Sequence, residues 1–193
     1  MFGRLRQRYE KALEPLGEAL ARLNIPPNLV TLIGLALAAF CCYVLYKGFL
    51  LYGLVLMITV GLIDMLDGAL ARASGKTTKF GGILDRVVDR YVEYAVLLGL
   101  IAGGFVNWFW GLFALFGMIM ASYTRAAAEA AMGEGCCSVG LMERQEKFLI
   151  IMVGALLNFV ILEALNYAVI LVGLLSHLTV IQRLKHAQRI TNA

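Results

Sequence analysis

Residues 64–89 read DMLDGALARASGKTTKFGGILDRVVD and place four aspartates at the ends of two apolar segments. Asp64 and Asp67 are three residues apart, and Asp85 and Asp89 are four apart, so each pair shares one face of a helix. Ionisable side chains inside membrane-spanning segments are costly and usually mark function. We therefore expect two consecutive antiparallel helices whose carboxylates converge on a small volume near one membrane surface.

The composition indicates a membrane protein. Of the 193 residues, 61% are hydrophobic and only 16% are charged, whereas a soluble domain is close to half apolar with about a quarter of its residues charged. A membrane-spanning helix needs about 20 largely apolar residues. On that basis we expect six spans, at 29–46, 50–71, 81–102, 105–127, 147–164 and 166–184. The expected fold is an all-α integral membrane protein that forms one domain over residues 1–193.

Residues 1–24 have the pattern of an amphipathic helix. Apolar side chains from Phe2 to Leu23 recur at roughly helical spacing, and basic residues such as Arg4 and Lys11 fill other positions. Such a helix can lie in the membrane interface. Packing against the cytoplasmic face of the protein itself is an equally open alternative.

The basic residues predict the orientation in the membrane. Lys47 lies in a loop expected on the outer side, whereas most of the other Lys and Arg residues lie in the loops and tails of the opposite side. By the positive-inside rule, both termini and the aspartates are expected at the cytoplasmic face of a plasma-membrane protein. The net charge of +4 then needs no nucleic-acid partner. The pairs Cys41-Cys42 and Cys136-Cys137 match no metal-ligand spacing.

Four neighbouring carboxylates in a medium of low dielectric constant would repel one another strongly, so a cation must compensate them. Oxygen-only ligands suit hard cations such as Mg²⁺ or Mn²⁺. One alternative is a buried ion-pair network with the three nearby arginines, which are Arg72, Arg86 and Arg90. Gly68 continues the Asp64 face with no side chain, which leaves room for a bulky ligand or for close helix packing.

Taken together, the stretch reads Asp64-x2-Asp67-Gly68-x2-Ala71-Arg72-x8-Gly81-x3-Asp85-x3-Asp89. It resembles the signature of the CDP-alcohol phosphotransferase family (also called CDP-alcohol phosphatidyltransferase), and every fixed position is filled. The resemblance extends to the six spans, the N-terminal helix and a Pro-Asn-x2-Thr start to the first span. It implies an enzyme of phospholipid biosynthesis that transfers a lipid phosphate from a CDP-linked lipid to an alcohol and releases CMP.

The resemblance also implies roles for individual residues. Asp64, Asp67, Asp85 and Asp89 would hold Mg²⁺ or Mn²⁺, with two ions, and Asp89 would be the general base for the acceptor hydroxyl. The expected CDP-lipid-binding residues are Asn28, Thr31, Gly68, Ala71, Arg72, Lys79 and Gly81. Lys79 and Lys76 flank the loop between the two motif helices and could instead face anionic headgroups. The family further suggests a homodimer. For Glu93, one turn beyond Asp89, a hydrogen bond inside the bundle and a dimer contact both stay open.

The acceptor alcohol is predicted from three basic residues in the second half of the chain. A phosphorylated acceptor needs its own cationic pocket. The stretches around Arg125, Arg144 and Arg183 resemble those of the phosphatidylinositol-phosphate and archaetidylinositol-phosphate synthase branch, in which matching residues hold the phosphate of inositol 1-phosphate. Snorkelling towards the membrane surface would also explain such residues, above all Lys147.

Three other functions stay open at this point. Glycerol 3-phosphate as the acceptor would satisfy the same basic residues, because they answer to the phosphate. An intramembrane prenyltransferase also uses Asp-rich motifs, although the asymmetric bridge from Arg72 to Gly81 argues against it. An ion-coupled transporter would also place carboxylates inside the membrane. Transporters tend to carry internal repeats, and none is evident here.

Overall fold

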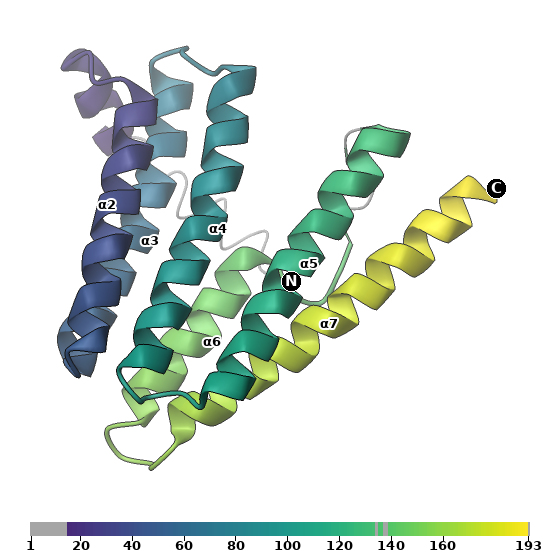
Figure 1. Ribbon diagram of the computed structural model, residues 1–193. Helices are drawn as coiled ribbons and strands as arrows, with labels where there is room; N and C mark the ends of the chain where they lie inside the picture. The colour runs from purple at the N-terminus through teal and green to yellow at the C-terminus, as the bar shows by residue number, and fades with distance from the viewer. Residues whose placement is uncertain (1–14, 134, 137–138, 193) are drawn as a thin grey trace. The chain divides into compact units, whose positions relative to one another are not determined.

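The computed structural model describes residues 15–133, 135–136 and 139–192, and these form an all-helical protein. Residues 15–22 are helical and precede the elements labelled in Figure 1. Those elements are α2 (Pro27–Tyr46), α3 (Leu50–Ala73), α4 (Lys79–Ala102), α5 (Trp108–Met132), α6 (Arg144–Leu157) and α7 (Ala164–Thr191). The predicted all-α fold is therefore confirmed, and each predicted span overlaps one helix.

The chain divides into two compact units. The first contains the residues up to Leu45 and Leu51–Val96, and so holds nearly all of α2 and α3 and most of α4. The second contains Tyr46–Leu50 and the chain from Leu97 onward, with α5, α6 and α7. All four motif aspartates lie in the first unit, and the three predicted acceptor residues lie in the second.

Within the described residues, α2, α3, α5 and α7 are long and apolar enough to cross a membrane. Many large apolar side chains on these helices are exposed, including Phe40, Tyr52, Phe116 and Leu174. Such a surface suits lipid, where no polar group needs to face outward. The chain is a multi-pass membrane protein. Helix α4 carries five charged residues between Asp85 and Glu93, which is why its composition differs from that of the other long helices.

Polar and small residues hold the first unit together. Helices α2, α3 and α4 lie side by side in Figure 1. The Thr31 hydroxyl of α2 donates to Asp67 of α3 at 2.7 Å, and the Cys41 thiol donates to the Gly53 carbonyl at 3.5 Å. Gly17 of the segment 15–22 approaches α3 so closely that a Cβ would lie 2.9 Å from the carbonyl carbon of Ala69.

The N-terminal expectation is therefore met in part of its range. The described end of the helix packs against α3, as the packing alternative requires at Gly17. Residues 1–14, which carry most of its basic side chains, lie outside the described residues. Whether the rest of the helix lies in the membrane interface or on the surface of the protein stays open.

Glycines bring the helices of the second unit into close contact. A Cβ at Gly173 of α7 would lie 2.9 Å from Cδ1 of Phe113 and 3.1 Å from Cα of Ala114, both in α5. Gly154 of α6 approaches α7 in the same way, next to Ala168 and the backbone of Leu165. Small residues at such crossings let helix backbones approach closely in membrane proteins.

Helix α6 is shorter than the predicted span at 147–164. It begins at Arg144 and ends at Leu157, and residues 158–163 form turns. Fourteen residues at 1.5 Å each give about 21 Å, less than the roughly 30 Å hydrocarbon thickness. The Asn158 side chain accepts a bond from the Leu165 amide at 3.3 Å, and Glu163 has φ 63°. A turn of mostly apolar residues, with Asn158 and Glu163 at its ends, thus replaces the last part of the expected span.

The packing predicts unequal effects of the same substitution at two helical glycines. Gly173→Ala should lower the thermal midpoint by several degrees, because the methyl group would press on α5 backbone at a cost of about 1–3 kcal/mol. Gly61→Ala in α3 should not lower it, because nothing lies within 4 Å of a Cβ there. Thermal unfolding of the two variants in the same detergent measures the difference. Equal midpoints would contradict the close α5–α7 contact.

Candidate active site

Three of the motif aspartates gather at one place in the first unit. Asp64 of α3 and Asp85 and Asp89 of α4 each offer a carboxylate oxygen, and these oxygens lie within 4.8 Å of one another. All three residues are half-buried. At that separation two negative charges repel by about 3 kcal/mol at an effective dielectric constant near 20. The arrangement suits a hard divalent cation, which takes oxygen ligands.

Asp67, predicted as a fourth ligand, is turned towards α2. Its Oδ2 accepts the Thr31 hydroxyl at 2.7 Å, and the residue is 7% exposed. Among the described residues, the clustered carboxylate oxygens come from the other three aspartates, and Asp67 is not one of that group. Thr31, expected to bind the CDP-lipid, therefore holds a motif carboxylate. The spacing of residues in the sequence does not indicate this bond.

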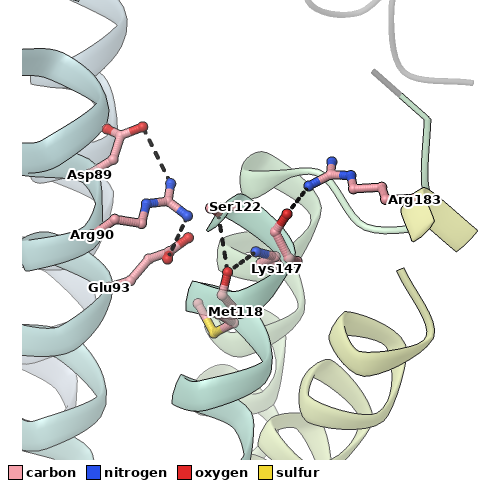
Figure 2. Close-up of polar contacts among 8 residues, drawn as sticks. Asp89, Arg90, Glu93, Met118, Ser122, Lys147 and Arg183 are labelled. Atoms are coloured by element: carbon pink, nitrogen blue, oxygen red, sulfur yellow. Dashed lines mark hydrogen bonds and ion pairs between the residues drawn. The ribbon is translucent and has the colours of Figure 1, made fainter. Parts of the chain in front are cut away.

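Arg90 joins Asp89 to Glu93 along α4 (Figure 2). Its Nη1 lies 2.9 Å from Oε2 of Glu93, and its Nη2 lies 3.5 Å from Oδ2 of Asp89. Glu93 is 1% exposed. The ion-pair alternative is thus observed at Arg90, and Glu93 makes a contact within its own helix. The i,i+3 spacing of opposite charges was a usable signal for this pair.

Several predicted CDP-lipid residues lie near the N-terminal ends of α2 and α4. The Gly81 amide donates to the Thr78 hydroxyl at 2.9 Å, and a Cβ at Gly81 would lie 3.3 Å from Oδ1 of Asn28. Gly81 therefore leaves space beside Asn28 that any side chain would fill. Lys79, the first residue of α4, is exposed.

The remaining predicted CDP-lipid residues lie at the C-terminal end of α3. A Cβ at Gly68 would lie 3.4 Å from Nη1 of Arg72, so the guanidinium folds back along its own helix towards Gly68. Arg72 is exposed, and Ala71 is half-buried. The predicted span 50–71 contained Gly68 and Ala71, whereas Arg72, expected in the loop, lies in the last turn of α3. Their binding role stays a prediction.

The predicted acceptor residues have protein partners in the second unit. Arg125 donates from Nε to Oε1 of Glu129 at 2.8 Å, one turn along α5. Arg183 is 6% exposed and donates to the backbone carbonyls of Val139, at 2.8 Å, and Ala121. The side chain of Arg144 lies outside the described part of the structure. These contacts leave the phosphate-binding role of all three as a prediction.

Lys147 is a buried cation for which the sequence left both snorkelling and an acceptor-binding role open. It is 2% exposed, and its Nζ donates to the Met118 carbonyl of α5 at 3.4 Å. The Ser122 hydroxyl donates to the same carbonyl at 3.2 Å (Figure 2). Lys147 therefore points into the second unit, and snorkelling to the membrane surface does not describe it.

Fold and site together define a multi-pass helical membrane protein with a three-carboxylate site on two consecutive helices. The sequence matches CDP-alcohol phosphatidyltransferase over residues 24–181, and the chain belongs to that family. The family predicted from the motif is confirmed, and with it the assignment of the chain as an enzyme of that type.

Several known proteins are similar to this chain over nearly its whole length. The archaetidylinositol phosphate synthase of Pyrococcus horikoshii is 39% identical over 190 residues, covering 98% of this chain and 97% of its own. The crystal structure of Mycobacterium tuberculosis phosphatidylinositol phosphate synthase with CDP-DAG bound superposes with a TM-score of 0.81 at 29% identity. That match covers 92% of this chain and 94% of the other.

A second crystal structure of the Mycobacterium tuberculosis enzyme, in complex with manganese and citrate, also has a TM-score of 0.81 at 29% identity. It covers 91% of this chain and 88% of the other. The likeness to known proteins thus extends over both compact units and is not confined to the aspartate motif.

The bond between α2 and α3 predicts a stability difference between two threonine variants. Thr31→Val removes the donor to the buried Asp67 and should cost about 1–3 kcal/mol of unfolding free energy. Thr59→Val should change it by less than about 0.5 kcal/mol, because that hydroxyl donates to Val55 of its own helix. Equilibrium unfolding in detergent compares them. A Thr31→Val variant as stable as Thr59→Val would refute the importance of the bond.

Proposed function

We propose that this chain transfers the phospholipid moiety of a CDP-linked lipid to a hydroxyl of inositol 1-phosphate and releases CMP. The observation that carries the proposal is the gathering of Asp64, Asp85 and Asp89 in a chain of the CDP-alcohol phosphatidyltransferase family. The lipid would be CDP-diacylglycerol or CDP-archaeol, since the similar proteins include synthases named for each kind of product.

The three clustered carboxylates fit a divalent cation, which supports a metal-dependent reaction. Asp64, Asp85 and Asp89 would hold the ion, with Asp67 as the fourth predicted ligand. The ion would be Mg²⁺ or Mn²⁺, and two ions are proposed. When bound, such ions neutralise charge on a diphosphate and polarise its phosphorus–oxygen bonds. Manganese in the similar crystallised enzyme supports this choice.

The residues of the chain supply the proton transfer and the binding. Asp89 would accept the proton of the acceptor hydroxyl, whose oxygen then forms a bond to the lipid-side phosphorus while the bond to CMP breaks. Arg90, held by Glu93, lies next to the Asp89 carboxylate and restricts its orientation. The CDP group would bind around Gly81 and Asn28, where the absence of a side chain leaves space.

Arg125, Arg144 and Arg183 are proposed to bind the acceptor phosphate. The Arg125 side chain is 41% exposed and is more accessible than that of Arg183. On binding the phosphate, Arg125 would give up its ion pair with Glu129. The inositol-linked names of the similar proteins favour inositol 1-phosphate over glycerol 3-phosphate as the acceptor.

The arrangement in the membrane is also a proposal. All of α2 to α7 would cross the membrane, α6 together with the mostly apolar turns at 158–163 that follow it. This gives six spans with both termini and the aspartates on the cytoplasmic side of the plasma membrane. The family match over residues 24–181 includes parts of both units and supports one domain over 1–193. A homodimer is proposed from the family resemblance.

An acceptor panel tests this function. The purified protein in lipid, with CDP-linked lipid and Mg²⁺, should release CMP with inositol 1-phosphate and not with glycerol 3-phosphate, free inositol or serine. CMP release in each reaction is the measurement. Release with glycerol 3-phosphate alone would keep the class of reaction and overturn the acceptor assignment.

The same assay tests the role of Asp89. Asp89→Asn should abolish CMP release, because the amide cannot accept the hydroxyl proton. CDP-lipid binding should stay within about tenfold of wild type, because the amide oxygen and the other aspartates can still ligate the metal ion. Turnover at the wild-type rate by this variant would remove Asp89 from the chemistry, even if the acceptor assignment holds.

A further inference from the structure

Three side chains of α7 hold the segment Val139–Met142, which leads from α5 into α6. The Gln182 side chain accepts the Leu141 amide at 3.0 Å, and the Thr179 hydroxyl accepts the Met142 amide at 3.3 Å. Arg183 donates from Nε to the Val139 carbonyl at 2.8 Å. Thr179, Gln182 and Arg183 are spaced i, i+3 and i+4, so they project from one face of α7.

The segment is pressed closely against this face. Thr179 is completely buried, Arg183 is 6% exposed and Met142 is 4% exposed. Gly140 has φ 142°, and a Cβ there would collide with the methyl group of Thr179. A residue with a side chain could therefore not replace Gly140 without moving the segment away from α7.

Arg183 also ties the segment to α5, because its Nη1 donates to the Ala121 carbonyl. One guanidinium thus joins three parts of the second unit through backbone acceptors. Backbone amides and carbonyls need partners, and an irregular segment cannot provide them from its own ladder of bonds. The α7 side chains supply these partners, so the segment has one defined place.

The start of α6 follows directly from this segment. Glu143 caps the helix, and its amide donates to Oε2 of Glu146 at 2.8 Å in a reciprocal capping box. Arg144 is the first residue of α6, and Lys147, one turn on, is buried against Met118. Because Met142 is fixed by Thr179 and Glu143 begins the cap, α7 sets the position of the first turn of α6.

We propose that Thr179, Gln182 and Arg183 form a clamp that positions the first turn of α6, which begins at the predicted acceptor residue Arg144, for binding an anionic acceptor. Thr179 and Gln182 are positioning residues that act through the 139–142 segment. The clamp rests on the proposed function, since it acts on the acceptor and leaves the CDP-lipid untouched. It gives Arg183 a structural role in addition to any contact with the acceptor phosphate.

The test removes the two uncharged acceptors of the clamp without changing side-chain bulk much. Thr179→Val and Gln182→Leu, separately and together, are compared with Thr191→Val, whose hydroxyl contacts the Ala187 carbonyl and Met132 Sδ, both outside the clamp. The double variant should raise the KM for inositol 1-phosphate about tenfold and leave the KM for the CDP-linked lipid within twofold, a loss near 1.4 kcal/mol in acceptor binding. Thr191→Val should match wild type.

Amide hydrogen exchange of residues 139–142 supplies a readout independent of turnover. Exchange should accelerate in the double variant and stay unchanged in Thr191→Val. Gln182→Leu alone, at a half-buried position, keeps the test valid if Thr179→Val fails to fold. Parallel losses in both KM values, or an unchanged acceptor KM with accelerated exchange, would overturn the clamp as an acceptor-positioning device.

Failure of the proposed function has a different signature. Wild-type protein that uses glycerol 3-phosphate in place of inositol 1-phosphate refutes the acceptor assignment, and the clamp is then measured with that acceptor by the same comparison of KM values. Wild-type protein that transfers lipid to no acceptor refutes both proposals.

Discussion

The mutual repulsion of Asp64, Asp85 and Asp89 is the constraint on which the first unit depends. Three carboxylate oxygens lie within 4.8 Å of one another, and a divalent cation among them would offset their mutual repulsion. Two consecutive helices supply them, Asp64 from α3 and Asp85 with Asp89, one turn apart, from α4. The neighbouring partners fit this constraint: Thr31 holds Asp67, and Arg90 lies between Asp89 and Glu93.

The second unit buries positive charges, whereas the first gathers negative ones. Lys147 and Arg183 are cations that are 2% and 6% exposed, and they donate to backbone carbonyls of Met118, Ala121 and Val139. Donation to several carbonyls offsets part of the cost of burying a charge. The bond from Arg183 to Val139 also holds the segment between α5 and α6, so the burial of this charge and the placement of the segment depend on each other.

Much of the fold could be predicted from the sequence, because long apolar runs and the i,i+3 and i,i+4 spacing of acids need no tertiary information. The end of α6 could not, because the apolar residues after Leu157 continue the hydropathy pattern while the Asn158 side chain and Glu163 close a turn. The bond from Thr31 to Asp67 and the carbonyl partners of Arg183 join residues far apart in sequence. No local pattern reports such contacts.

Binding of Mn²⁺, followed by electron paramagnetic resonance with the protein in lipid, tests the central claim most directly. Wild type should bind the ion, Asp85→Asn should weaken binding at least tenfold, and Glu163→Gln, which changes a carboxylate outside the cluster, should leave it unchanged. Equal Mn²⁺ affinity in wild type and Asp85→Asn would contradict a metal site built on Asp64, Asp85 and Asp89.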